Sequence, residues 1–378
     1  MPKQKNKVFS SHPGSFIKEP DLVSIQTESF KWFTERGLKD LLKEVSPIID
    51  YSGKEFELHF KDFYFDEPKF SIEEVKDKAL TYEAPLRMTV ELTNINTKKT
   101  ISQEIYFGDF PIMTKRGTFI INGVERVIIS QLVRSPGVYF VSTNVRGYKY
   151  FGAKIIPNRG AWVEFVTDSD GALQVKIDRH RKVPATSFLR IFGLETDEAI
   201  KATFNSEKEL KHIEATLKKD SAKNLSDSYM EIYKRLRPGD LAAPDAAKSL
   251  IDSMFKRDDR YDLSEVGRFK INQRLGTEDS SSRLIEQKDI IRIVKEMISL
   301  NNNPDAKDDD IDHLGNRRVR AVGELLEMRM RLGFSRMRRI VQDRMSTLEK
   351  ATLTPVQLVN VRPLIASVRD FFATSSMS

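Results

Sequence analysis

Apolar and polar side chains alternate along three stretches in the first third of the chain. A period of two is typical of strands that bury one face, so we expect strands there. The stretches are 55–60, 86–92 and 101–107, and polar residues at 94–97 predict a turn between the last two. Before them, Asp21 can cap a helix that reaches about Arg36 and stops at Gly37.

The residues around Asn122-Gly123 carry a strong hairpin signal. Short apolar runs flank this dipeptide within 119–127, and both of its residues tolerate the positive φ that a type I′ turn requires. A second β region is expected at 161–167 and 173–177, with a turn at 168–171 between its two strands.

Beyond Pro184 the apolar residues recur at helical spacing, which predicts helices near 206–218, 226–236, 245–256 and 286–300. A longer apolar stripe runs from Val319 to Leu348. We interpret 317–350 as one helix that braces two domains, because it exceeds the roughly 25 residues typical of a globular helix. Two short helices are expected after Thr354 and Arg362. The polar residues 1–20 are expected to form a flexible arm.

Composition restricts the class of protein. Hydrophobic residues at 39% and charged residues at 31% indicate a soluble protein, and 378 residues suffice for two or three domains. The chain has no cysteine, and no apolar run approaches the roughly 18 residues of a membrane span. We therefore expect a cytoplasmic protein with no membrane partner. The net charge of +7 favours a polyanionic partner, either nucleic acid or an acidic protein.

No arrangement of residues predicts catalysis by this chain. The histidines share no metal-ligand spacing, and no glycine-rich loop ends in the Lys-Ser/Thr pair of a phosphate-binding P-loop. The consecutive carboxylates of Asp308, Asp309 and Asp310 could hold magnesium, but such runs usually lie in solvated turns. We expect no catalytic residue, cofactor or metal site in the chain.

The segment 308–320 joins a cluster of carboxylates directly to a cluster of arginines. Arginine can donate two parallel hydrogen bonds to phosphate, and an acidic side chain beside it can accept hydrogen bonds from an unpaired base. The pattern indicates a site for an open nucleic-acid strand. The alternative is that the aspartates cap a helix and pair with the arginines, and the segment alone does not decide between the two.

Five blocks of the sequence resemble the β subunit of bacterial DNA-directed RNA polymerase, in the order of that family. They are 82–87, 117–132, 134–138, 177–186 and 308–320, and the resemblance extends from about Leu22 to the last residue. It implies a two-lobed α+β protein, in which an α/β lobe domain is inserted into a mixed β-sheet protrusion domain. The implied boundaries are 21–125 and 322–378 for the protrusion and 126–321 for the lobe.

The assembled enzyme of this family is a nucleotidyltransferase that transcribes DNA into RNA from ribonucleoside triphosphates. The resemblance implies that this portion forms one jaw of the DNA cleft and holds the non-template strand and the downstream duplex. The implied partners are the largest subunit, which holds the catalytic magnesium, the α dimer, ω and a σ factor. The chain stops before the portions that assist catalysis, so we interpret it as a fragment that is not catalytic alone. A free-standing nucleic-acid-binding module is the alternative.

The resemblance assigns a pocket for the non-template strand to Arg134, Trp162, Ile311, Asp312 and Arg317. Trp162 offers a stacking face, worth about 1–3 kcal/mol per base, unless it is a core residue of the lobe sheet. Asp312 can accept hydrogen bonds from N1–H and the exocyclic amine of guanine. The two arginines can neutralise phosphate or support that aspartate.

Two further groups are candidates. Arg179, Arg181 and Lys182 follow a predicted strand and could contact phosphates of the downstream duplex, or form an ordinary solvated loop. His180, between them, stands where the family more often has arginine. The end of the chain resembles the opening of the segment that lines the rifamycin pocket, whose edge would include Ile129, Ser375, Met377 and Ser378.

Overall fold

The computed structural model describes residues 21–373, apart from 146, 242, 278–279 and 350–351. The predicted arm at 1–20 therefore lies outside the described residues. The chain divides into two compact units, of which unit 1 comprises Met1–Gln131 with Val319–Ser378 and unit 2 comprises Leu132–Arg318. Each unit contains helices and antiparallel strands, which confirms the predicted α+β class.

Unit 1 is built on a four-stranded sheet in the order β1-β2-β3-β4. These strands are Ile48–Ile49, Phe56–Phe65, Glu83–Asn94 and Thr100–Pro111, and the short helix α3, Ile72–Asp77, lies between β2 and β3 in the sequence. The predicted alternation is present, because Met88, Val90 and Leu92 of β3 are buried. The predicted turn between β3 and β4 is also present, and the Asn94 side chain accepts the Asn96 and Thr97 N–H groups at 3.0 Å each.

The predicted hairpin is confirmed. Strands β5, Phe119–Ile121, and β6, Val124–Arg126, pair antiparallel across Asn122 and Gly123. These two residues have φ angles of 51° and 78°, as a type I′ turn requires.

The N-terminal helix does not stop at Gly37, so that prediction was wrong. Helix α1, Ser24–Trp32, continues through a π-helical turn, Phe33–Gly37, into α2, Leu38–Val45. Gly37 has the ordinary helical φ of −57°. The apolar face continues past it, since Leu38, Leu41, Leu42 and Val45 are all buried. The glycine instead makes room for a neighbour, because an added Cβ would lie 3.0 Å from the Trp32 ring.

Helix α11, Val322–Thr347, is shorter than the predicted helix at 317–350. Residues Arg317–Arg320 form strand β13 instead, which pairs with β7, Gln131–Arg134. The helix begins where the Ser29 hydroxyl accepts the Gly323 N–H at 2.9 Å, a cap that no local sequence signal reveals. Val319 and Leu348, assigned to the apolar stripe, lie outside the helix and are exposed.

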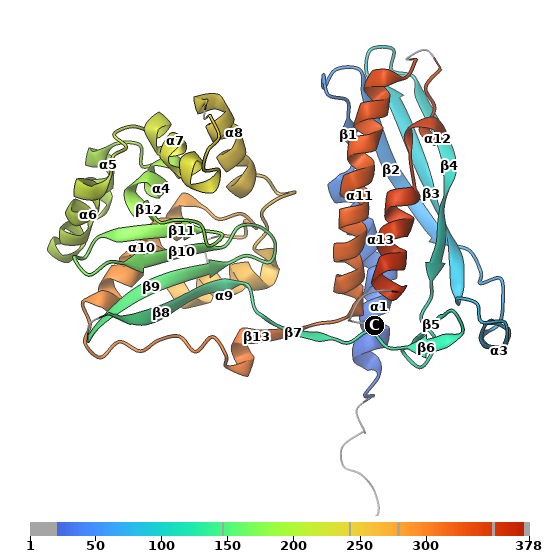
Figure 1. Cartoon of the computed structure of the whole chain (residues 1–378), viewed down its shortest axis with the longest axis horizontal. Helices are drawn as coiled ribbons and strands as arrows, with labels where there is room; N and C mark the ends of the chain where they lie inside the picture. The colour runs from blue at the N-terminus through green and yellow to red at the C-terminus, as the bar shows by residue number, and fades with distance from the viewer. Residues whose placement is uncertain (1–20, 146, 242, 278–279, 350–351, 374–378) are drawn as a thin grey trace, which may run out of the picture. The chain divides into compact units, whose positions relative to one another are not determined.

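The buried stripe of α11 completes the core of unit 1 and includes Leu326, Met330, Phe334, Met337 and Val341. Helix α11 packs against α1, α2 and α13, which is Arg362–Ala373. The short helix α12, Pro355–Leu358, lies between α11 and α13 in the sequence. Figure 1 shows α11 and α13 side by side in front of the sheet. All of these elements belong to unit 1.

Unit 2 contains a five-stranded antiparallel sheet in the order β12-β11-β10-β9-β8. The predicted strands β10, Val163–Thr167, and β11, Leu173–Ile177, are present, and β12 is Val183–Pro184. Strands β8, Gly137–Val145, and β9, Tyr148–Ile156, were not predicted. The helices are α4, Ala185–Ile191; α5, Asp197–Thr203; α6, Glu207–Lys219; α7, Leu225–Leu236; α8, Pro244–Phe255; α9, Ser264–Leu275; and α10, Gln287–Asn301. The four predicted helices correspond to α6, α7, α8 and α10.

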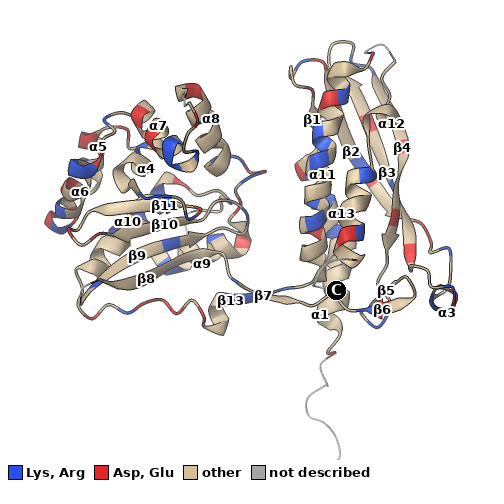
Figure 2. Cartoon of the chain, viewed as in Figure 1, with Lys and Arg blue, Asp and Glu red and all other residues tan. Residues whose placement is uncertain are grey.

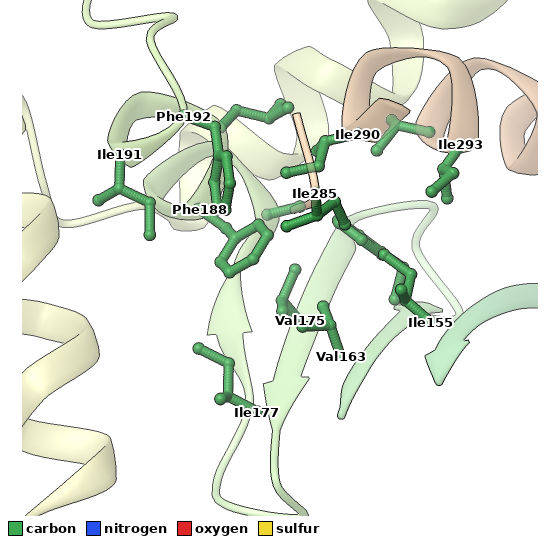
Figure 3. Packing of buried hydrophobic residues seen from close by; sticks show 14 of the residues in the cluster. Ile155, Val163, Val175, Ile177, Phe188, Ile191, Phe192, Ile285, Ile290 and Ile293 are labelled. Carbon is green, nitrogen blue, oxygen red and sulfur yellow. The ribbon is translucent and has the colours of Figure 1, made fainter. Parts of the chain in front are cut away.

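One face of this sheet carries the core of unit 2. Val163, Val175 and Ile177 point from the strands toward Phe188 of α4 and toward Ile290 and Ile293 of α10, as Figure 3 shows. All of these side chains are at most 2% exposed. The opposite face of the strands is therefore the one that can present polar and aromatic side chains outward.

Candidate nucleic-acid interface

Several predicted site residues lie at one end of the unit 2 sheet. The strand register aligns Val138, Ile155, Val163 and Ile177 in one buried row across four strands. Arg134 precedes this row, Trp162 directly precedes Val163, and Arg179 follows Ile177. Because neighbouring strands are antiparallel, the start of β8 and β10 and the end of β9 and β11 meet at the same edge. The fold thus gathers residues that are far apart in the sequence.

Trp162 is half-buried and stands immediately before β10. Its neighbours Ala161 and Val163 are buried, so the tryptophan is not on the core face of the sheet. Its main chain is held on both sides by Asp178, whose carboxylate accepts the Trp162 N–H at 2.7 Å and whose N–H donates to the Trp162 carbonyl at 2.9 Å. These bonds fix the backbone of Trp162, and the residue stays partly exposed to solvent.

The basic loop after β11 begins next to Trp162. Asp178 and Arg179 have φ angles of 46° and 66°, so the chain turns sharply there and exposes Arg179 and Arg181 to solvent. Lys182 is paired with Asp168 at 2.9 Å. The two arginines are accessible to a phosphate backbone, whereas Lys182 would first have to leave its partner.

Arg134 and Asp312 are brought together by the fold. Arg134 ends β7 and Asp312 lies in the loop before β13, and Nη2 of the arginine is 4.0 Å from Oδ1 of the aspartate. The Asp312 side chain is 74% exposed and that of Arg134 is 40% exposed. The pair is therefore loose and accessible, and it can offer both an acceptor for a base and a donor for phosphate.

The carboxylates before Asp312 have structural roles. Asp309 accepts the Phe140 N–H at 2.8 Å and its own N–H donates to the Phe140 carbonyl, so the segment lies along β8. Asp308 accepts the Ser142 N–H at 2.9 Å and pairs with Lys149 at 3.0 Å. Burial raises the pKa of Asp308, but the bonds from Ser142 and Lys149 outweigh it and hold the pKa below its usual value. These two carboxylates thus attach the loop to the sheet.

The arginines after the loop have different environments. Ile311 and Arg317 are half-buried. Arg317 begins β13 after a short 3₁₀ turn, Leu314–Asn316. Arg318 donates to the Asn158 side chain at 2.9 Å, which ties β13 to the end of β9. The predicted role of Arg317 at phosphate stays a prediction.

Helix α11 belongs to unit 1, and Figure 2 marks its arginines in blue. Some of these arginines form contacts within unit 1. Arg331 bridges Glu44 and Glu327 at 2.7 and 2.8 Å, and Arg344 donates to the Gln357 carbonyl. Ile129, the predicted edge of an antibiotic pocket, is 61% exposed. Ser375, Met377 and Ser378, the other residues predicted at that edge, lie outside the described residues.

Three residues that support the site were missed in the sequence. Asp178 holds Trp162, and an aspartate after a strand is a recognisable signal for a left-handed turn. Lys270 of α9 donates to the Gly315 carbonyl at 2.7 Å, and burial lowers its pKa. Asn316 accepts a Ser135 N–H on its carbonyl at 2.9 Å. No local pattern could have revealed the last two, because both contacts join distant segments.

Within the described ranges, no helix is long and apolar enough to cross a membrane. Over the same residues, no three acidic or histidine side chains come together in a way that could hold a metal ion.

Comparison with known proteins identifies the relatives of this chain. Residues 134–320 match the family model for RNA polymerase Rpb2, domain 2. A protein of Syntrophomonas wolfei named DNA-directed RNA polymerase subunit beta is 45% identical over 364 residues, which cover 96% of this chain and 32% of that relative. By sequence, this chain is homologous to part of the RNA polymerase β subunit. A β subunit of Chloroflexus aggregans is similarly 43% identical, with 96% of this chain and 32% of the relative covered.

The resemblance noted in the sequence is thereby confirmed. The chain spans about a third of the length of the β subunits that it matches. The matched domain begins at Arg134 and ends at Arg320, close to the limits of unit 2.

Proposed function

We propose that this chain is part of the β subunit of a DNA-directed RNA polymerase and that unit 2 holds an unpaired, non-template DNA strand. Two observations support the proposal: Trp162 is partly exposed at one end of the unit 2 sheet, and Arg134 and Asp312 form an accessible pair. The homology to β subunits supplies the substrate class. The enzyme to which the chain would contribute makes RNA from ribonucleoside triphosphates.

Each side chain would have a distinct part in holding the strand. The Trp162 ring would stack on one unpaired base, and Asp312 would accept hydrogen bonds from the edge of a guanine. Arg134, beside Asp312, would donate to a phosphate or orient the aspartate. Arg179 and Arg181 would contact phosphates of the downstream duplex, which gives affinity without sequence preference. These residues bind and position the strand, and none performs chemistry.

The assembled polymerase would also contain the largest subunit, an α dimer, ω and a σ factor, and would work in the cytoplasm. Magnesium in that assembly would be held by the largest subunit. This chain would form one jaw of the DNA cleft.

The test measures binding of the chain to a DNA bubble and to the matched duplex. Trp162→Ala is expected to weaken bubble binding about tenfold through loss of stacking, and to leave duplex binding nearly unchanged. Trp32→Ala is the matched control, because Trp32 lies in unit 1 and is the second tryptophan of the chain. Equal effects of the two substitutions, or equal affinity of the parent for bubble and duplex, would contradict the proposal.

A further inference from the structure

We propose that Asp310 is a positioning residue for the neighbouring Asp312, which it holds in the conformation that reads a base. The inference rests on the proposed function, because it assumes that Asp312 accepts hydrogen bonds from an unpaired guanine. Asp310 itself would contact no nucleic acid. It would act through the backbone of the loop 310–316.

One carboxylate oxygen of Asp310 closes the loop at its start. Oδ1 accepts the Asp312 N–H at 3.0 Å and the His313 N–H at 3.1 Å. Two donors on one acceptor define the direction in which the Asp312 side chain leaves the backbone. That side chain has no comparable anchor of its own, since it is 74% exposed and its distance to Arg134 is 4.0 Å.

Asn316 closes the same loop at its end. Its side-chain amide donates to the Asp310 carbonyl at 2.6 Å, and its own carbonyl accepts the Ser135 N–H at 2.9 Å. Lys270 adds a bond from Nζ to Oδ1 of Asn316 at 3.1 Å. The loop is therefore tied to the residue that follows Arg134. Through these contacts, Asp310 fixes the position of Asp312 relative to Arg134.

Electrostatics argue against direct contact between Asp310 and the strand. A carboxylate beside a phosphate backbone lowers affinity, so its charge alone gives no benefit at this position. What the loop requires is an acceptor oxygen at the end of a short side chain. Asparagine offers the same oxygen at the same distance from the backbone without the charge. A comparison of aspartate with asparagine at position 310 therefore separates the effect of positioning from the effect of charge.

The experiment compares DNA bubbles that carry guanine or inosine at the unpaired position, using the chain and its variants. Inosine lacks the exocyclic amine, so the ratio of the two affinities reports the contact with Asp312. The parent is expected to prefer guanine about tenfold, as one lost base contact predicts. Asp312→Ala and Asp310→Ala should both reduce this ratio to about one, whereas Asp310→Asn should retain it. Asp305→Ala, an exposed aspartate of the same segment, is the control for loss of charge.

The outcomes separate this inference from the proposed function. A parent that does not distinguish guanine from inosine would overturn the base-reading role of Asp312 and the inference with it. A parent that does, together with an unchanged ratio in Asp310→Ala, would overturn the inference alone. If Asp310→Asn also reduced the ratio of guanine to inosine affinity to about one, the charge of Asp310 would be responsible and not its positioning of Asp312. Amide exchange at Asp312 and His313 without DNA gives a second readout, expected to be about tenfold faster in Asp310→Ala and nearly unchanged in Asp310→Asn.

Discussion

Asp220 is the acceptor for several donors in the interior of unit 2. Arg190, whose side chain is 0% exposed, donates to it at 2.7 Å, and Ser187 and the Ala222 N–H donate at 2.9 Å each. Arg190 also pairs with Asp197. A buried guanidinium keeps its charge at any pH at which the protein folds, so it depends on these carboxylates for compensation.

Asp220→Ala is expected to lower the free energy of unfolding of unit 2 by about 3–5 kcal/mol, because it removes one partner of a buried charge. The matched control is Asp240→Ala, since the Arg237–Asp240 pair is 3.9 Å apart and more than half exposed. It should cost less than about 1 kcal/mol. Urea unfolding of both variants measures the difference, and equal costs would contradict the role assigned to the Asp220 network.

From the sequence, Trp162 could be either an exposed stacking residue or a core residue of the sheet. Alternation within 161–165 shows that Trp162 and Val163 point to opposite faces, but it does not say which face is buried. That depends on Phe188 and the helices that cover one side of the sheet. The approach of Arg134 to Asp312 was likewise implied only by resemblance, because no local rule connects residues so far apart in the chain.

At the scale of elements, the sequence predicted those elements whose conformation depends on neighbouring residues alone. The hairpin at 119–126 was found because Asn122 and Gly123 tolerate the left-handed backbone that the turn needs. The strand at Arg317–Arg320 was assigned to a helix, because its side chains fit the helical stripe that follows. The pairing of β13 with β7 outweighs the helical pattern of its sequence, and the segment alone does not predict this pairing.

Gly123→Ala is expected to destabilise unit 1 by about 2–4 kcal/mol. Its φ of 78° disfavours any side chain by about 1–2 kcal/mol, and an added Cβ would also lie 2.8 Å from the Cα of Ala79. Gly53→Ala isolates the first effect, because Gly53 has a φ of 68° and nothing within 4 Å of the added Cβ. Thermal unfolding should show the larger loss for Gly123→Ala. A loss no larger than that of Gly53→Ala would mean that the contact with Ala79 relaxes freely.

At the scale of the whole molecule, the two units have separate cores and one tryptophan each. Trp32 belongs to unit 1 and Trp162 to unit 2, and the chain contains no other tryptophan. The core of unit 1 surrounds Phe334, and that of unit 2 includes Phe188, both 0% exposed. Single-tryptophan variants can therefore report on the two units independently.

Phe334→Ala is expected to lower the free energy of unfolding reported by Trp32 by about 3–5 kcal/mol, through loss of buried surface and the cavity left behind. The unfolding reported by Trp162 should not change. Phe188→Ala should have the reverse effect. The measurement is tryptophan fluorescence in urea, with the other tryptophan replaced by phenylalanine. If both substitutions shifted both reporters alike, the units would unfold as one.

Unit 2 is continuous in the chain, whereas unit 1 is made of two separate segments. A ribosome therefore finishes unit 2 while the sheet of unit 1 still lacks α11, the helix that covers Phe60 and Phe107 with Phe334. At about 5–20 residues per second, the interval between synthesis of Pro111 and Val322 lasts about 10–40 s. During that time α1 and α2 are already made, but the part of the sheet around Phe60 and Phe107 lacks the helix that covers it. Nascent chains should consequently be bound by chaperones at this face, and released when α11 leaves the exit tunnel.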